Sequence, residues 1–303
     1  MLIFDGHCDS LSRYQEDLRE DISFRQFDFA KVQNLDWIQV MAAFSWKENR
    51  GEITFDDFLH LYEKLKNQLP KNSMILKEKN DFFQRQEKCP CVVFAIEGAE
   101  FLQGDLQHIQ EMYQLGVRMF GLTWNNDNFM AGGCKNDCMG LTSAGKVGVK
   151  MLNELGMIID GAHLSHRGLK EVLACSKRPI VVSHTACNKL CQHKRNLTDD
   201  EIKEIALAGG VIGICFVDEF LYNRGTRRAN ISDVVEHIYH VADLVGSEYV
   251  ALGSDFDGVE RPLSGLENAN QLLRLPAYLR AMGFGQEDIE NVMGKNWLRV
   301  FTQ

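Results

Sequence analysis

The sequence predicts one α/β domain over residues 1–303, folded as a (β/α)8 barrel of the TIM type with extra helices at its C-terminal end. Two observations support this prediction. Eight short, uniformly apolar runs recur along the chain, as expected for strands of a parallel sheet that is covered on both faces. The segments between these runs show helical periodicity and helix-capping residues. Strands that alternate with helices favour one barrel, which usually needs ~250 residues, over two separate domains.

The predicted strands are distributed over most of the chain, and the first begins at the second residue. Each run is short and apolar, and glycine or polar residues follow it. In chain order, the runs cover residues 2–6, 37–44, 91–98, 117–124, 156–163, 179–184, 210–216 and 249–258.

Two of the predicted helices have clear end signals. Thr198 and Glu201 have the spacing of a capping box, and apolar residues follow at helical intervals. The next helix has one apolar face and closes at Gly246, and we expect Ser232 to be its N-cap. Residues 265–303 are expected to form helices added after the eighth strand.

Composition argues against several classes of protein. The formal net charge is −9 and there is no long basic run, so a nucleic-acid-binding surface is not expected. No apolar run reaches ~18 residues, so no membrane span is expected, and the first residues lack the charged segment of a signal peptide. The pairs Cys134/Cys138 and Cys187/Cys191 lack CxxC spacing. We therefore expect the nine cysteines to be mostly reduced thiols in a cytoplasmic protein.

The segment MLIFDGHCDS places His7 and Asp9 at the end of the first predicted strand. Alternate residues of a strand point to the same side, so these two side chains can offer a nitrogen and an oxygen to one metal ion. Taken alone, the pair is also compatible with a polar loop in which Asp9 is a capping residue.

Further polar residues stand at the carboxyl ends of the predicted strands. In a parallel barrel these ends meet on one face, which is where such barrels carry their chemistry. Each residue by itself is compatible with a structural role, and Asp257 before Gly258 is compatible with a turn. Buried charges are costly unless they pair or bind a metal, so the convergence of the whole set indicates a metal centre. The set consists of His7, Asp9, Glu97, His163, His184 and Asp255.

The residue types in this set favour zinc. Three imidazoles with carboxylates suit zinc better than magnesium or calcium, which prefer oxygen ligands. Six donors exceed the needs of one tetrahedral zinc ion, so the natural arrangement is two ions that share a bridging carboxylate. The other histidines are left outside the set: His237 and His240 are expected on a solvated helix face, and His60, His108, His166 and His193 lack ligand partners at strand ends.

Seven segments of the chain form an ordered pattern that is very specific as a set: DGHCD, AIEGAEFL, LTWN, DGAHLS, VVSHT, KRNLTDDEI and GSDFDGV. This pattern resembles the membrane (renal-type) dipeptidases, which are zinc metallopeptidases on an amidohydrolase-like barrel, and most closely their soluble microbial members. The resemblance covers nearly the whole chain.

The resemblance implies how the metal ligands are shared. His7 and Asp9 would hold one zinc ion. His163 and His184 would hold the second ion, and Glu97 would bridge the two.

The resemblance also implies two roles outside the ligand set. Asp255 would be the acid/base that takes a proton from the bridging water and passes it to the leaving amine. Arg195 would bind the terminal carboxylate of the substrate, for which a planar guanidinium is well suited. Without the resemblance, Arg195 reads as a surface arginine near Asp199 at a helix entry.

One position departs from the family. The animal enzymes have a substrate-contacting histidine in an LTH motif, whereas this chain has Trp124 there. Asn125 or Asn126 could supply the missing hydrogen-bond donor, and Trp124 could simply wall the pocket. The glycine-containing loop at 128–140 is compatible with a lid over the substrate and with an ordinary surface loop. The membrane anchor and disulfides of the animal enzymes have no counterpart here.

Three functional hypotheses follow. The first is a zinc dipeptidase that cleaves short peptides with a free C-terminus through a metal-bridging hydroxide; the resemblance implies that a D-residue is accepted at the second position, and it allows for a homodimer. The second is another hydrolase on the same barrel, such as a lactonase, a deaminase or a cyclic-amide hydrolase. The third is a metal-binding or partner-binding protein that has lost turnover, for which Trp124 is the main support.

Overall fold

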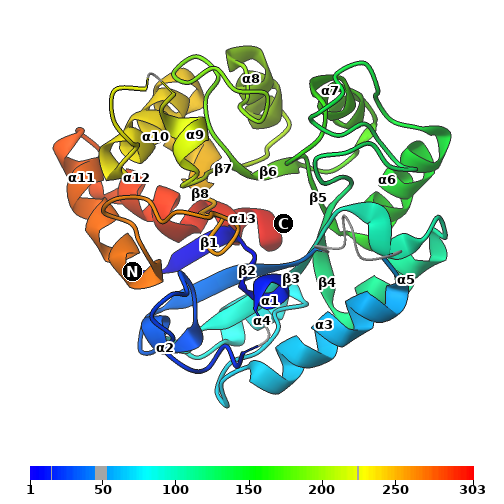
Figure 1. Ribbon diagram of the computed structural model, residues 1–303, viewed down its shortest axis with the longest axis horizontal. Helices are drawn as coiled ribbons and strands as arrows, with labels where there is room; N and C mark the ends of the chain where they lie inside the picture. The colour runs from blue at the N-terminus through cyan, green and yellow to red at the C-terminus, as the bar shows by residue number, and fades with distance from the viewer. Residues whose placement is uncertain (15, 45–52, 224) are drawn as a thin grey trace.

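Eight parallel strands pair in chain order and close into a barrel, as the apolar runs predict (Figure 1). The computed structural model describes residues 1–14, 16–44, 53–223 and 225–303. Each predicted run contains one strand. The strands are β1 Ile3–Cys8, β2 Trp37–Ala43, β3 Cys91–Glu97, β4 Val117–Gly121, β5 Ile158–Asp160, β6 Ile180–Thr185, β7 Ile212–Ile214 and β8 Val250–Leu252.

Helices surround the barrel on its outer side (Figure 1). The longer ones are α3 Phe55–Gln68, α5 Gln107–Leu115, α6 Ser143–Leu155, α7 His166–Cys175, α8 Asp199–Leu207 and α10 Ile231–Val245. Short helical segments lie between them: α1 Ser10–Arg13, α2 Phe29–Val32, α4 Lys79–Gln84, η1 Ala99–Leu102, α9 Asp218–Leu221 and η2 Ser247–Tyr249. The predicted C-terminal helices are present as η3 Ala269–Arg274, α11 Leu275–Ala281, α12 Gln286–Glu290, η4 Asn291–Lys295 and α13 Asn296–Phe301.

Strand β3 shows how the alternation of side chains separates two apolar layers. Phe94 and Ile96 belong to the larger cluster, which the barrel forms with its helices. Val93 and Ala95 belong to a smaller cluster that includes residues of β1 to β6 and β8, with Trp297 and Val300 of α13 packed among them. Residues from strands all around the barrel can meet only on its inner side. Glu97 has the same parity as Val93 and Ala95, so its carboxylate points inward at the carboxyl end of the barrel.

The helix ends confirm one capping prediction and correct another. Thr198 and Glu201 form the expected capping box at the start of α8. The expectation that Ser232 caps α10 is wrong, because the helix begins earlier and Asn230 is its N-cap. The Asn230 side chain accepts a hydrogen bond from the Ser232 backbone at 2.9 Å, and Asp233 completes the box by accepting from the Asn230 backbone.

The placement of His237 on a solvated face is also wrong. The residue is 1% exposed, and its ring lies between the backbone N–H of Cys187 at 2.9 Å and the backbone carbonyl of Leu221 at 3.2 Å. Burial lowers the pKa of His237 to about 4, so the ring is a neutral structural group. His240, one turn away, is partly buried and its Nε2 lies 2.8 Å from a carboxylate oxygen of Asp199.

Among the described residues, no helix has both the length and the apolar character needed to cross a membrane. All nine cysteines are free thiols, and most of them are buried.

The C-terminal segment packs against the barrel at the seam where its first and last strands meet. Strands β1 and β8 are paired at one position, Asp5 with Leu252. Trp297 of α13 packs beside this seam, fully buried, and its indole N–H donates to the Leu252 carbonyl at 2.8 Å. Gly6 has no side chain because a Cβ there would overlap the Trp297 ring.

We predict that Trp297→Ala lowers the free energy of unfolding by ~3–5 kcal/mol, because it leaves a large cavity and an unpaired carbonyl at the seam. Denaturant unfolding followed by circular dichroism measures the change. Leu207→Ala is the matched control, since Leu207 is 91% exposed and its loss should change stability by less than ~0.5 kcal/mol. Equal stability of the two variants would show that the indole does not hold the seam.

Candidate metal centre

The six residues of the predicted set come together at the carboxyl ends of the strands. Their donor atoms form overlapping groups in which all atoms lie within 4.8 Å of one another. One group contains Glu97, His163 and His184, and another contains His7, Asp9 and Asp255. A third joins His7 and His184 to Asp160, a residue that sequence reasoning did not single out.

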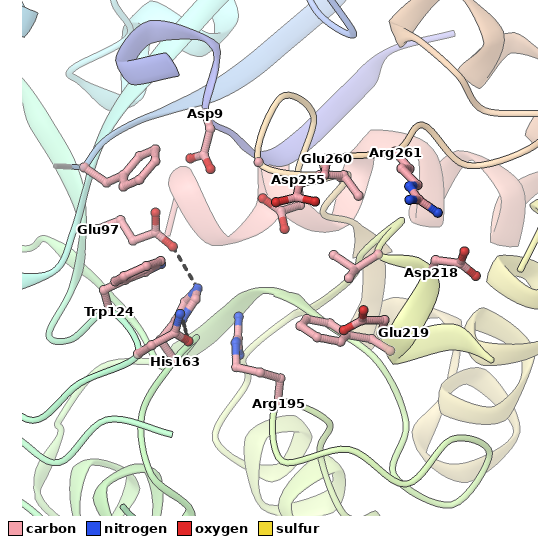
Figure 2. Close-up of a pocket in the computed structure, with 16 residues that line it drawn as sticks. Asp9, Glu97, Trp124, His163, Arg195, Asp218, Glu219, Asp255, Glu260 and Arg261 are labelled. Carbon is pink, nitrogen blue, oxygen red and sulfur yellow. Dashed lines mark hydrogen bonds and ion pairs between the residues drawn. The ribbon is translucent and has the colours of Figure 1, made fainter. Parts of the chain in front are cut away.

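Glu97 lies between the two halves of this cluster. Its Oε1 is 2.9 Å from His163 Nε2 (Figure 2). The same oxygen is 3.6 Å from His184 Nε2. Its Oε2 faces His7 Nε2 at 3.8 Å. His7 Nε2 is in turn 3.2 Å from Asp9 and 3.9 Å from Asp255. One carboxylate therefore faces His7 on one side and His163 with His184 on the other, as a bridging ligand must.

The outer hydrogen bonds of two imidazoles direct their lone pairs inward. His163 Nδ1 lies 3.0 Å from Asn125 Oδ1, which can only accept, so this nitrogen carries the hydrogen. His184 Nδ1 lies 2.8 Å from Ser183 Oγ, whose own hydrogen goes to Asp160. The Nε2 atoms of the two rings are then both acceptors, and they face each other at 2.8 Å. A cation bound by both nitrogens would satisfy both lone pairs.

Buried atoms without partners give an independent test of whether a metal fits. Glu97 Oε2 is buried and has no hydrogen-bond donor among the described residues, and the same holds for His7 Nδ1. A buried carboxylate oxygen is costly unless a cation or a donor compensates its charge. The donor set of nitrogen and carboxylate oxygen suits zinc. The residues present therefore fit a metal centre.

The electrostatics of the cluster also favour added positive charge. Burial and the neighbouring Glu97 raise the pKa of Asp9, and burial with Asp9 raises the pKa of Asp255 well above its usual value. Burial lowers the pKa of His163 to about 4 and lowers that of His184 well below its usual value, so both rings stay unprotonated. Burial disfavours the charged form of His7, but Glu97 and Asp9 outweigh it and raise the pKa of His7 to about 10.

Arg195 stands beside the cluster and is not a surface residue. It is 7% exposed and follows β6, and its Nη2 donates to the His184 carbonyl at 3.2 Å. Its guanidinium carbon lies 5.6 Å from the centre of the Phe220 ring. Among the described residues no carboxylate lies within ion-pair distance, and the buried Nε has no partner. The alternative reading of Arg195 as a surface arginine near Asp199 is wrong because its side chain is buried, and the Asp199 carboxylate faces His240.

A cavity of about 690 Å³ opens directly over this arrangement. Asp9, Glu97, His163, Arg195 and Asp255 form its inner part (Figure 2). The aromatic rings of Phe44, Trp124 and Phe220 are among its walls. Asn125 also lines it, and the outer wall carries charged residues: Asp218, Glu219, Glu260 and Arg261.

The profile of the membrane dipeptidase family, peptidase family M19, matches residues 1–303. The chain belongs to this family. It is 34% identical over 218 residues to an uncharacterized dipeptidase of Schizosaccharomyces pombe, covering 70% of this chain and 52%, about half, of that relative. It is 35% identical over 225 residues to an uncharacterized protein from the pqqA 5′ region of Klebsiella pneumoniae, covering 71% of this chain and 83% of the other.

The solved structures include a metallopeptidase from Rhodobacter sphaeroides liganded with a phosphinate mimic of the dipeptide L-Ala-D-Ala. It is 22% identical, with a TM-score of 0.86 over 99% of this chain and 98% of that chain. At this identity the likeness shows the shared barrel fold.

Asp257 and Gly258, after β8, form the turn that the Asp-Gly dipeptide predicts, and both also contact distant segments of the chain. The Asp257 carboxylate is outside the metal cluster and accepts from the Ser10 and Tyr14 side chains and from the backbone N–H groups of Gln26 and Phe27. Gly258 lines the cavity, and a Cβ there would overlap carboxylate oxygens of Asp9 and Asp255. The dipeptide signals a turn, but this close approach depends on tertiary structure.

Proposed function

We propose that this protein is a zinc-dependent dipeptidase that acts on short peptides with a free C-terminus. The observation that carries the proposal is Arg195: a buried guanidinium, without a carboxylate partner in the described part of the chain, lines the same cavity as the imidazole–carboxylate cluster. Burying an unpaired guanidinium is costly, and the terminal carboxylate of a peptide is a planar, bidentate partner for it.

Two zinc ions would be held by five residues of the cluster. His7 and Asp9 would hold one ion, His163 and His184 the other, and Glu97 would bridge them. The facing Nε2 atoms and the two-sided position of Glu97 support this division. When bound, the zinc pair supplies Lewis-acid chemistry that acidifies water and polarises the peptide carbonyl.

Asp255 would carry the proton in the reaction. Its carboxylate lines the cavity next to Asp9, and no hydrogen bond from a described residue occupies its oxygens. Asp255 can therefore accept the proton of the attacking water and deliver it to the nitrogen of the leaving amine.

The rest of the cavity would select the substrate. Trp124 walls it, and the Nδ2 of Asn125, whose Oδ1 is engaged by His163, is available to donate to a substrate carbonyl. Glu219 and Glu260 line the outer part of the cavity and have no ion pair among the described residues, so they form an acidic wall for the substrate's free amino group. Arg195 and this acidic wall line the same cavity as the cluster, which favours very short peptides.

Stereochemistry and location are further parts of the proposal. The neighbouring structure from Rhodobacter sphaeroides holds a mimic of an L-D dipeptide, which supports including L-D pairs among the substrates of this chain. Nine free thiols fit a reducing compartment, and we place the protein in the cytoplasm.

The deciding experiment is hydrolysis of L-L and L-D dipeptides by protein that is stripped with a chelator and then given zinc. We expect cleavage to be lost on stripping and restored with about two equivalents of zinc. Lactones and cyclic amides belong in the same panel. If two zinc ions bind and only these substrates turn over, the protein is another hydrolase of this barrel; if nothing turns over, it is a metal-binding protein without this activity.

Asp255→Asn should reduce kcat for a dipeptide by about 10²–10⁴-fold, because an amide cannot carry the proton. Its zinc content, measured on the same preparation, should remain that of the wild type. Full turnover with metal bound would refute the proton-carrying role, and loss of one zinc ion would make Asp255 a ligand instead.

Arg195→Met should raise KM for a dipeptide by about 10- to 150-fold, since a charged hydrogen bond contributes ~1.5–3 kcal/mol. The matched substrate is the same dipeptide with a C-terminal amide, for which the variant and the wild type should behave alike. Arg195→Lys should recover part of the loss because it keeps the charge without the bidentate geometry. An equal effect on acid and amide would place Arg195 outside carboxylate recognition.

A further inference from the structure

The loop between β4 and α6 contacts the candidate metal centre at His163. We propose that this loop is a fixed clamp for His163, and that Asn125 and Cys134 within it are positioning residues of the metal centre. The inference rests on the proposed zinc centre and adds two residues to it.

The backbone of the loop is hydrogen-bonded on both sides of Leu164, the residue that follows His163. The N–H of Cys134 donates to the His163 carbonyl at 2.8 Å, and the N–H of Ser165 donates to the Gly132 carbonyl at 2.9 Å. Gly133 and Leu164 form an antiparallel bridge between these two bonds. The loop therefore pairs with the segment that carries the imidazole, as a short added strand would.

This pairing holds the backbone of His163 in a strained conformation. His163 has a φ of 65°, in the left-handed region, although it is not a glycine. Such a conformation costs of order 1–3 kcal/mol and persists only where the surroundings impose it. β5 ends at Asp160, so His163 is not held by the barrel sheet itself. The clamp supplies the restraint that the strand no longer provides.

Two side chains of the loop fix the imidazole ring. Asn125 Oδ1 lies 3.0 Å from His163 Nδ1 and 3.1 Å from Cys134 Sγ, and Cys134 is 3% exposed. A thiol and an imidazole N–H both donate to one oxygen, so the amide presents its oxygen to His163. With the amide reversed, His163 would carry its hydrogen on Nε2, and that nitrogen could not bind a metal.

The packing of the loop argues against a lid. Residues Met130 to Cys134 are buried. A Cβ at Gly133 would come within 2.6 Å of the Asn125 and Asn126 carbonyl oxygens, and one at Gly132 would overlap the Met139 carbonyl. A lid needs room to swing, whereas here backbone lies against backbone. Of the two possibilities for residues 128–140, a lid or an ordinary surface loop, neither describes this arrangement.

His184 provides an internal comparison. Its Nδ1 is held by Ser183 and, through it, by Asp160, and both are residues of barrel strands. The partners of His184 are therefore fixed by the sheet, whereas those of His163 come from the β4–α6 loop. Outer hydrogen bonds of this kind are worth about 10- to 100-fold in metal affinity.

The test is zinc affinity measured by competition with a chromophoric chelator, with the absorption spectrum of the cobalt-substituted protein as a second readout. Asn125→Leu removes the acceptor, and we expect one of the two ions to bind about 10- to 100-fold more weakly while the other is unchanged. Asn125→Asp keeps an acceptor and should retain wild-type affinity and a wild-type cobalt spectrum. Lys135→Ala, an exposed position of the same loop, is the control without effect.

The thiol is tested by a second pair of variants. Cys134→Ala should weaken the binding of the same zinc ion, and Cys134→Ser, which keeps a hydrogen-bond donor, should restore the affinity. If Asn125→Leu fails to fold, this pair of variants still tests the clamp. Two ions bound by Asn125→Leu with wild-type affinity and spectrum would overturn the clamp while leaving the zinc centre intact. A wild-type protein that binds fewer than two ions would overturn the centre itself, and the clamp with it.

Discussion

The position of Glu97 between two groups of imidazoles is the constraint on which the rest of the site depends. Its carboxylate is almost fully buried, and its two oxygens face His163 and His7 on opposite sides. Three carboxylates in so small a volume repel one another, and burial raises the cost of each charge. Positive charge must therefore be supplied at this place. The barrel makes this possible because its parallel strands all end at one face, so residues that are far apart in sequence become neighbours.

The strands and the ligand set could be predicted from sequence because both depend on local signals. Each strand is an apolar run, and each site residue stands within a few positions of the end of one. Asn230, His237 and Gly258 were missed for the opposite reason. Which residue caps α10, whether a helix face is covered and whether a Cβ would meet Asp9 are decided by segments distant in the chain. The helical periodicity predicted that His237 lies on an exposed face, but the segments that contribute Cys187 and Leu221 cover it.

The hydrogen bonds of the imidazoles also could not be predicted from the sequence. The sequence indicates that His163 and His184 are donors, but it does not indicate which nitrogen of each ring is free. The free nitrogen of His163 follows from its contact with Asn125, and that of His184 follows from its contact with Ser183, which is bound to Asp160. These partners leave no motif of their own, because asparagine and serine near strand ends are common and usually serve turns. The residues of the cluster are thus predictable as residue types, whereas the groups that orient their imidazoles become visible only in the fold.

Trp124 illustrates how the cavity can change while the centre stays the same. The residue stands where the animal enzymes of the family carry a histidine, yet its ring centre lies 6.3 Å from that of His163 and it walls the cavity. The next residue, Asn125, reaches the His163 ring with its oxygen and leaves its amide nitrogen toward the remaining space. A tryptophan and an asparagine together can therefore supply an apolar wall, a hydrogen-bond donor and an anchor for the metal ligand. The substitution leaves every donor of the imidazole–carboxylate cluster in place.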